Sequence, residues 1–242
     1  MDWSVIEVTQ INLHHSKGAS AILARHQSKM HTAISLMQEP WVVHGCVRGV
    51  AACGKLFRAP TEQRSRAYIA VKGLEACLLP ELCSRDLAAV EVMATGRIGG
   101  TKRLVICSAY FPHGKEVPPP ELVRLVDFCQ KEGLLVVGCD ANAHHTIWGS
   151  TNMNERGEKL LEYLITTDLE VLNRGNQPTF CTRVRREVLD LTLCSRRAMS
   201  EVTGWRVSNE PSLSDHRLIT FRLSDLKVEA RKVRNPKRTD LL

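Results

Sequence analysis

The sequence of 242 residues lacks the features that mark several protein classes. Its nine cysteines form no C-x-x-C pair, so zinc-finger spacing is absent, and their odd number in apolar runs indicates reduced, buried thiols. The N-terminus has neither the basic start nor the apolar stretch of a secretion signal, and apolar runs such as residues 134–137 are far too short to cross a bilayer. These absences predict a soluble protein of the cytoplasm or nucleus, with no membrane partner.

Internal repeats are also absent, and composition excludes disorder for the bulk of the chain. Apolar residues make up 43% and charged residues 24%, and the length is sufficient to bury a full core, either as one large α/β domain or as two small ones. The formal net charge is +7. An excess of Lys and Arg favours a polyanionic partner such as nucleic acid, although many basic proteins bind nothing acidic.

Hydrophobic periodicity predicts a mixture of strands and helices. Helices are expected over residues 16–33, 121–131 and 155–167, and strands over residues 5–13, 33–38, 67–72, 87–94, 104–111, 134–138, 169–172, 188–193, 201–207 and 218–223. Strands dominate without strict βαβ alternation, which indicates two packed mixed β-sheets flanked by helices. We expect residues 1–224 to form one domain and residues 225–242 to form a basic linker or tail, whose abrupt end is typical of a piece of a longer protein.

Polar side chains stand at the ends of several of these strands. Rigid elements place side chains at strand ends while leaving them open to solvent, so functional groups concentrate there. A complementary set on independent strands is harder to explain by chance than any single member. The set is Asn12, Glu39, Tyr110, Asp140, Asn142, Asp190, Asp215 and His216.

Asp190 lies inside a leucine-rich run, where an isolated carboxylate is costly to bury unless it is paired. An aspartate that accepts from an imidazole N–H fixes the tautomer and stabilises the imidazolium, so Asp190 and His216 are a candidate acid/base dyad. The alternative is a solvated acid at a strand end beside an ordinary surface histidine.

The other strand-end groups suit phosphodiester hydrolysis with a hard metal ion. Mg²⁺ prefers oxygen ligands, and Glu39 is the first choice for it, the alternative being an acid that caps the turn at Pro40. Asp140 and Asn142 could hold and activate a water molecule, or simply form an Asx turn. The Tyr110 hydroxyl could bond a phosphate oxygen, or the ring could be a core aromatic with its tip in water.

In order and approximate spacing, this set resembles the exonuclease–endonuclease–phosphatase superfamily over nearly the whole chain, up to about Ser224. The segments that carry the resemblance are Gln38-Glu39-Pro40, Ala109-Tyr110-Phe111-Pro112, Gly138-Cys139-Asp140-Ala141-Asn142, Val188-Leu189-Asp190 and Ser214-Asp215-His216, together with Asn12 and Thr179-Phe180. Two further segments, Asp140-Ala141-Asn142-Ala143-His144-His145 before Trp148-Gly149 and Pro178-Thr179-Phe180, resemble the apurinic-like endonuclease domain of non-LTR retrotransposons. The similarity is strongest to arthropod elements that insert at fixed sites in ribosomal RNA genes or telomeric repeats.

The resemblance implies a four-layer α/β sandwich that uses Mg²⁺, with Mn²⁺ as an alternative. It implies an endonuclease that nicks one strand of double-stranded DNA in the nucleus and leaves a 3′-hydroxyl to prime reverse transcription. The implied partner is the rest of a larger retrotransposon polyprotein, including a reverse transcriptase.

The resemblance also implies roles for individual residues. Glu39 would bind the metal with help from Asn12, and Asp140 with Asn142 would position or activate water. His216, oriented by Asp190, would contact the scissile phosphate with help from Tyr110, and Asp215 would act near the metal or the water. Whether Asp140 or His216 takes the proton stays open.

One departure and one surface complete the expectations. Abasic-site repair enzymes of the superfamily commonly carry an acid two residues after the first-strand Asn, where this chain has His14, which argues against a second metal site and repair activity. Candidate DNA-binding residues are Thr179, Arg183, Arg185 and Arg186, with His144 and His145 either structural or facing DNA. Residues 174–186 and 195–199 are candidates for sequence preference.

Two competing functions remain open at this level. A phosphatase of phosphoinositides or an esterase of sphingomyelin would share the superfamily fold, but the basic charge and the His144-His145 pair disfavour it. A DNA-binding module that has lost its chemistry is the other, and the presence of all the candidate catalytic groups argues against it.

Overall fold

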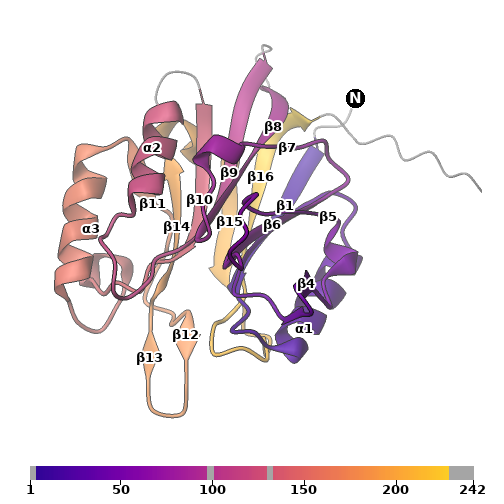
Figure 1. Cartoon of the computed structure of the whole chain (residues 1–242). Helices are drawn as coiled ribbons and strands as arrows, with labels where there is room; N and C mark the ends of the chain where they lie inside the picture. Colours follow the sequence, from indigo (N-terminus) through magenta and orange to yellow (C-terminus); the bar gives the residue numbers. More distant parts are fainter. Residues whose placement is uncertain (1–3, 97–100, 130–132, 229–242) are drawn as a thin grey trace, which may run out of the picture.

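The computed structural model describes residues 4–96, 101–129 and 133–228. Two β-sheets pack face to face with helices on their outer faces (Figure 1). The first sheet has the strand order β11 (Leu169–Val171), β14 (Asp190–Ser195), β10 (Gly133–Asp140), β9 (Thr101–Tyr110) and β8 (Leu87–Gly96), with β7 (Cys77–Leu78) paired to β8. The second has the order β15 (Val202–Val207), β16 (Ile219–Val228), β1 (Ser4–Asn12), β2 (Ala33–Gln38), β6 (Ala67–Lys72) and β5 (Lys55–Phe57). Residues 94–96 of β8 pair with residues 226–228 of β16, which joins the two sheets at one edge.

Alternation along the strands explains the layers. In β9, Leu104 and Ile106 point between the sheets while Val105 and Cys107 point to the outer face, and both pairs are buried. A strand that is apolar on both faces needs a cover on each. The outer face of the first sheet is covered by α2 (Pro120–Cys129) and α3 (Glu155–Thr166), and that of the second by α1 (Lys17–Ser28). The predicted four-layer α/β sandwich is therefore confirmed.

The apolar layer between the sheets becomes polar toward the carboxyl ends of β1, β2 and β10. Gln10 Nε2 donates to the carbonyls of Cys139 (3.3 Å) and Leu191 (3.0 Å), which ties β1 to the opposite sheet. Gln38 Nε2 donates to the carbonyl of Gly138 at 3.1 Å. A Cβ on Gly138 would lie 2.8 Å from Gln10 Oε1, so only glycine allows this approach. These bonds fix the two sheets against each other close to the strand ends.

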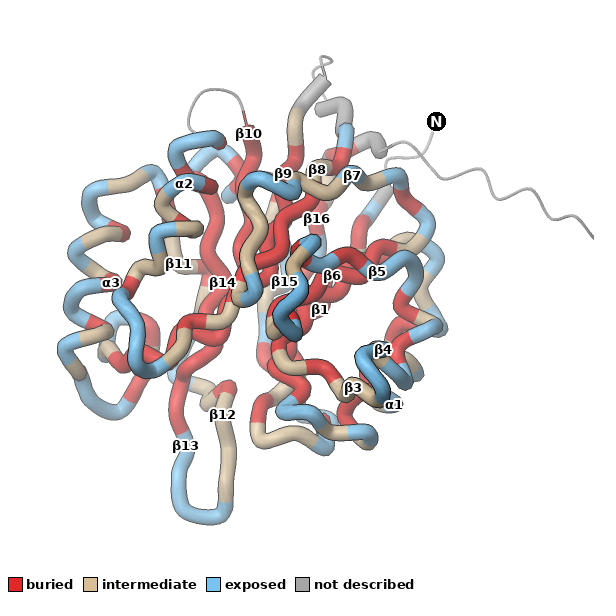
Figure 2. The backbone as a smooth tube through the Cα atoms, viewed as in Figure 1, coloured by how far each residue is buried: buried red, intermediate tan, exposed pale blue. Residues whose placement is uncertain are grey.

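Short elements lie in the connections and were not expected from periodicity. They are the strands β3 (Val42–Val43), β4 (Cys46–Val47), β12 (Phe180–Cys181) and β13 (Arg186–Glu187), and the 3₁₀ helices η1 (Ala51–Cys53), η2 (Pro80–Leu82), η3 (Thr146–Trp148) and η4 (Arg196–Glu201). Except for η4, these elements have two or three residues, which are too few to show a period. Figure 1 shows the β12–β13 hairpin projecting from one end of the sandwich, and Figure 2 shows its tip exposed.

Many boundaries differ from the prediction by a few residues, as for β14, which was expected over residues 188–193. The first helix ends at Ser28, well before residue 33, and residue 201 closes η4 and does not begin a strand. The predicted tail from residue 225 begins inside β16, because Leu226 is fully buried and pairs with β8. Residues 229–242 of the predicted tail lie outside the described residues. No helix in the described part of the chain is long and apolar enough to span a membrane.

Candidate active site

The candidate catalytic groups meet at one end of the sandwich because several strands end there. In the parallel pair β9 and β10, Asp140 lies opposite Tyr110, and in the antiparallel pair β10 and β14 it lies opposite Asp190. Across the sandwich, Asn12 and Gln38 end the parallel strands β1 and β2 side by side. Strand register therefore places Asp140 and Asp190 side by side in the first sheet, and Asn12 beside Gln38 in the second.

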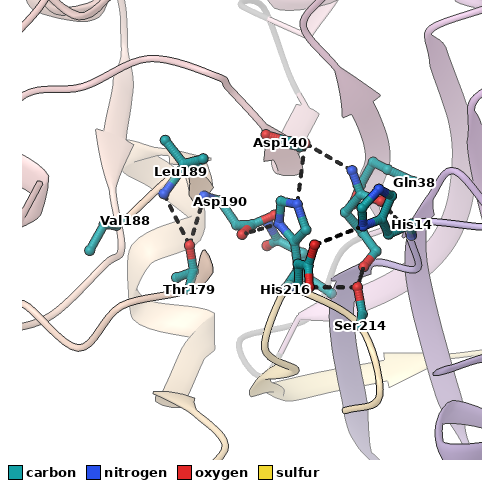
Figure 3. Close-up of polar contacts among 12 residues, drawn as sticks. His14, Gln38, Asp140, Thr179, Val188, Leu189, Asp190, Ser214 and His216 are labelled. Atoms are coloured by element: carbon teal, nitrogen blue, oxygen red, sulfur yellow. Dashed lines mark hydrogen bonds and ion pairs between the residues drawn. The ribbon is translucent and has the colours of Figure 1, made fainter. Parts of the chain in front are cut away.

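His216 completes the centre from the segment before β16. Its Nδ1 lies 2.8 Å from Asp190 Oδ2, and its Nε2 lies 3.9 Å from Asp140 Oδ2 (Figure 3). The exposed fraction of the side chain is 7% for His216, 0% for Asp190 and 3% for Asp140. The imidazole thus stands between two carboxylates in a site from which most water is excluded, where charge interactions are strong.

Burial and charge shift the pKa values of this group in opposite senses. Burial disfavours the imidazolium of His216, but the charge and hydrogen bond of Asp190, with the charges of Asp140 and Glu39, outweigh burial and raise its pKa to about 9. For Asp140, burial raises the pKa, His216 lowers it and Asp190 raises it, with a net value of about 6. Near neutral pH the site therefore holds a protonated imidazole beside a carboxylate that can still accept a proton.

Asp190 is held in place by Thr179. The Thr179 hydroxyl oxygen accepts from the backbone N–H groups of Leu189 (3.0 Å) and Asp190 (2.9 Å), as drawn in Figure 3. The prediction that Thr179 binds DNA is wrong, because its side chain is fully buried and its oxygen faces these two amides. Thr179 also takes part in the backbone pairing that brings in the histidine segment, since its carbonyl accepts from the Arg217 N–H at 2.6 Å.

We expect Thr179→Val to lower the free energy of unfolding by about 1–3 kcal/mol, because two buried amides lose their acceptor without any change of side-chain size. Urea denaturation followed by tryptophan fluorescence measures the change. Thr203→Val, on the exposed part of β15, is the matched control and should leave the midpoint in place. Equal midpoints for the two variants would contradict this role of Thr179.

Asn12 links the two carboxylates on the other side of the centre. Its Nδ2 donates to Asp140 Oδ2 at 2.9 Å and lies 3.4 Å from Glu39 Oε2, while its Oδ1 accepts from the His14 N–H at 2.8 Å. Glu39 is fixed by its backbone, because its N–H donates to the Arg66 carbonyl and its own carbonyl accepts from His15. The carboxylates of Glu39 and Asp140 therefore converge on one point.

Asp140, Asp190 and His216 also form a group that could hold a metal ion, since one ligand atom of each lies within 4.8 Å of the others. The hydrogen bonding argues against His216 as a ligand here, because Nδ1 is engaged by Asp190 and a protonated imidazole has no free lone pair. A hard cation is better served by the oxygens that converge from Glu39 and Asp140.

Tyr110 and Asn142 lie beside Asp140. The guanidinium of Arg66 packs over the Tyr110 ring, 4.4 Å from its centroid, and forms two hydrogen bonds to Asp86. Burial, together with the charges of Glu39 and Asp140, raises the pKa of Tyr110, so its hydroxyl keeps its proton at neutral pH. Asn142 donates from its backbone N–H to Asp140 Oδ1 at 3.3 Å, which is the Asx-turn bond, and from its side chain to the Phe111 carbonyl at 3.2 Å.

Asp215 lies at the rim of the centre. Its side chain is 43% exposed, and its Oδ2 is 3.2 Å from Nδ1 of His14. His14 is the residue that stands where abasic-site repair enzymes commonly carry an acid. The same segment is fixed through Ser214, whose hydroxyl donates to the Asn12 carbonyl at 2.7 Å and accepts from the His216 N–H at 3.1 Å. Asp215 thus belongs to the segment that carries the imidazole but stands farther out than Asp140 and Asp190.

Strained backbone is concentrated around the centre. The non-glycine residues with positive φ are His14 (45°), His15 (54°), Glu39 (46°), His44 (50°), Asn142 (47°) and Leu213 (58°), within the described part of the chain. All but His44 belong to, or lie next to, the segments just described. Such conformations persist only where surrounding bonds impose them, and they are typical of functional sites.

The comparisons with known proteins agree with this geometry. Residues 104–220 match a family model described as Endonuclease-reverse transcriptase. Among solved structures, the endonuclease domain of TRAS1, a telomere-specific non-LTR retrotransposon, is similar with a TM-score of 0.79 and 29% identity, over 92% of this chain and 99% of that one. Over the matched residues the chain is similar to the endonuclease–reverse transcriptase family. The resemblance to retrotransposon endonuclease domains is confirmed.

More distant structures share the fold of this chain. The catalytic domain of APE2 from Xenopus laevis has a TM-score of 0.65 at 12% identity, over 94% of each chain. The AP endonuclease LMAP from Leishmania major has a TM-score of 0.65 at 13% identity, over 91% of this chain and 88% of that one. No curated protein matches the chain.

The basic residues expected to bind DNA are distributed around the β12–β13 hairpin. Arg183, Arg185 and Arg186 are exposed at or beside its tip, next to Val184, which is 96% exposed. The hairpin is joined to the centre, because the Phe180 ring packs edge-on against the His216 ring with centroids 5.0 Å apart. A basic surface thus begins directly beside His216.

His144 and His145 both make contacts within the protein. His144 is buried, its Nδ1 lies 2.7 Å from Asn152 Oδ1, and its Nε2 lies 2.6 Å from Arg185 Nη2. His145 accepts from the Ile147 N–H through its side chain and packs against the Trp148 ring. Of the two roles that the sequence left open for this pair, DNA contact is excluded for the buried His144.

Four residues that serve the site were missed from the sequence. Gln38 was named only beside Glu39 in a segment that carries the resemblance, and Gln10, Arg66 and Arg156 were not singled out. A glutamine in an apolar strand was a usable signal, because a buried amide must be hydrogen-bonded and so indicates a polar neighbour. No local pattern marks the partners of the two arginines.

Proposed function

We propose that this domain is a divalent-metal-dependent endonuclease that nicks one strand of double-stranded DNA and leaves a 3′-hydroxyl to prime reverse transcription. The observation that carries the proposal is the convergence of Asp140, His216 and Asp190 in one buried group beside Glu39 and Asn12. The family match, whose description names a reverse transcriptase, supports a domain of a larger polyprotein. In the proposed function it acts on chromosomal DNA in the nucleus.

The residues present fit a hard divalent cation such as Mg²⁺ or Mn²⁺. Glu39 and Asp140 direct carboxylate oxygens at one point beside the Asn12 amide, 3.4 Å and 2.9 Å from its nitrogen. Glu39 with Asn12 would hold the ion. A bound ion would neutralise phosphate charge and stabilise the leaving oxygen.

The remaining groups divide acid and base roles between them. His216 is protonated at neutral pH and can donate from Nε2 to a phosphate oxygen, while Asp190 keeps Nδ1 occupied and the ring in orientation. Asp140 can take a proton from the attacking water, which Asn142 helps to orient. The pKa order favours Asp140 as the base, because an imidazole that already carries two protons cannot accept another. Tyr110 supplies a further hydroxyl donor to the phosphate.

The test is incubation of the purified protein with supercoiled plasmid and Mg²⁺, followed by mapping of the ends. We expect open circles, no cleavage in EDTA, and nicks that a DNA polymerase extends directly, which requires a 3′-hydroxyl. Plasmids carrying telomeric repeats or a ribosomal RNA gene decide between the two target classes. Intact plasmid under every metal, with DNA binding retained, would refute the proposal, and phosphate release from inositol phospholipids would replace it with phosphatase activity.

Glu39→Gln should weaken metal dependence more than it weakens DNA binding. Loss of one carboxylate ligand is expected to raise the Mg²⁺ concentration for half-maximal nicking by about 10–100-fold, because neutral amides are poorer ligands for hard cations. Nicking rates over a Mg²⁺ titration measure the effect. Glu158→Gln, on the exposed face of α3, is the control and should follow the wild-type curve. A Glu39→Gln curve that coincides with wild type would exclude Glu39 as a ligand.

Arg183→Ala and Arg186→Ala should each weaken DNA binding about equally on all sequences and lower the slope of log affinity against log salt by about one. The reason is that each exposed arginine can release roughly one counterion from the phosphate backbone. Fluorescence anisotropy with a labelled duplex at several salt concentrations measures the slope. Arg124→Ala, on α2 in the outer layer, is the control and should leave the slope unchanged. An unchanged slope in both hairpin variants would show that the hairpin does not contact phosphates.

A further inference from the structure

The guanidinium of Arg156, in the first turn of α3, is enclosed by backbone carbonyls. All five of its N–H donors have a carbonyl to bond. Nε lies 3.0 Å from the oxygen of Asn142, Nη1 lies 3.1 Å and 2.6 Å from those of His113 and Lys115, and Nη2 lies 3.4 Å and 3.5 Å from those of Phe111 and Ala141. Because guanidinium has five N–H donors in a planar fork, none is left over for a phosphate.

The two segments that supply these carbonyls both carry site residues. Residues 111–115 follow Tyr110 directly, and residues 141–142 follow Asp140. Asn142 is in the left-handed region at φ 47°, and its side chain donates to the Phe111 carbonyl, so the segments also touch each other. Without a cation between them, several carbonyl dipoles would face one another with few partners.

The start of α3 is fixed against the same loop by its neighbours. Asn154 Oδ1 accepts from the N–H groups of Gly157 (2.8 Å) and His144 (3.1 Å), and the Asn154 N–H donates to the His144 carbonyl. A Cβ on Gly157 would lie 1.8 Å from that carbonyl, so the approach requires glycine. The helix therefore presents Arg156 to the loops from a rigid base.

Helix stability does not explain an arginine at this place. Asn154 already caps the helix, and a cation in the first turn is opposed by the positive end of the helix dipole, which favours the acids Glu155 and Glu158 found there. The cation is compensated by the carbonyls of the two loops and by the charge of Asp140.

We propose that Arg156 is a positioning residue of the endonuclease reaction, which acts by holding Asn142 and the segment after Tyr110 in register with Asp140. The inference rests on the proposed function, since the reaction it serves is DNA nicking. Arg156 touches neither substrate nor metal in this role.

Arg156→Lys is the decisive variant, because it keeps the charge and removes the planar fork. We expect kcat for plasmid nicking to fall about 100-fold, as for a small misplacement of catalytic groups, with KM changed by less than about twofold. Lys159→Ala, one turn further along the same helix and exposed, is the control and should nick at the wild-type rate. A raised KM with unchanged kcat would overturn the proposal in favour of phosphate contact.

A double-mutant cycle separates positioning from general stability. If Arg156 acts through Asn142, Arg156→Lys should lower kcat much less in an Asn142→Ala background than in the wild type. Losses that multiply would overturn the proposal. Should Arg156→Lys fail to fold, Arg156→Gln, which keeps two N–H donors, takes its place in the cycle.

Amide hydrogen exchange supplies a readout that does not depend on activity. Arg156→Lys should accelerate exchange in peptides covering residues 111–116 and 140–145 and leave the strands of the second sheet unchanged. Unchanged exchange in those peptides would overturn the proposal even if the wild type nicks DNA. A wild type that does not nick, combined with accelerated exchange in the variant, would instead refute the proposed function and leave the contacts of Arg156 established.

Discussion

Asp140→Asn is expected to reduce the rate of plasmid nicking by at least about 10³-fold while the protein stays folded and binds DNA. Asn keeps the size of the side chain and can replace neither the proton acceptor nor the charge that faces Glu39 and His216. First-order rates of conversion of supercoiled to open-circular plasmid at saturating Mg²⁺ measure the loss. Asp168→Asn, a partly exposed aspartate that pairs with Arg196, is the matched control and should retain the wild-type rate.

The same variant should not cost stability. Because the folded-state pKa of Asp140 is raised to about 6 from an ordinary 3.8, folding takes up a proton, and this carboxylate destabilises the native state as pH rises through that window. Thermal unfolding in EDTA at pH 7 should therefore give Asp140→Asn a Tm at least as high as that of the wild type. A much lower Tm would mean that Asp140 is held for the fold, and nicking at the wild-type rate would remove it from the reaction.

His216→Ala and Asp190→Asn should produce the other large losses, each about 10³–10⁴-fold in kcat. Alanine removes the donor to the phosphate. Asparagine keeps the shape of the dyad but presents an amide to Nδ1, so the imidazolium loses the charge that holds its pKa near 9. Single-turnover nicking with excess enzyme separates this loss from any change in DNA binding.

Because the two side chains act as a unit, their losses should not multiply. The double variant Asp190→Asn with His216→Ala should be about as slow as His216→Ala alone. If the two losses in kcat multiply in the double variant, Asp190 acts on the reaction by a route other than the imidazole. One such route is metal binding within the group that Asp190 forms with Asp140 and His216. His31→Ala, at an exposed position outside the site, is the control for histidine replacement.

Much of the fold follows from patterns that lie within a few residues of each other. Residues 33–38 and 67–72 were expected as strands and are β2 and β6 with the same bounds. A short, nearly continuous apolar run is typical of a strand that is buried on both faces. The short hairpins and 3₁₀ helices were missed, since two or three residues carry no period. The first helix was expected to run too far because its C-terminal end has no strong stop signal before β2.

Residue types and their positions at strand ends predicted most of the residues of the candidate site but little of its geometry. Asp190 was expected to need a partner, and the expected His216 lies 2.8 Å away. Thr179 was misassigned to DNA because its neighbours in sequence, Phe180 and the arginines after it, lie toward the surface while its own hydroxyl turns inward to the Leu189 and Asp190 amides. Arg156 was missed because its five carbonyl partners come from two other segments, residues 111–115 and 141–142.

The amino-acid sequence by itself determined which strands form, which of their faces are apolar, and which chemical groups stand at their ends, because strand alternation and end residues are local properties of the chain. Only the tertiary structure decided which of those groups meet, which nitrogen of His216 faces Asp190, and which polar side chains support the centre from within. These depend on strand order and on contacts between residues more than a hundred positions apart, such as Asn12 with Asp140, and no local pattern encodes such distances.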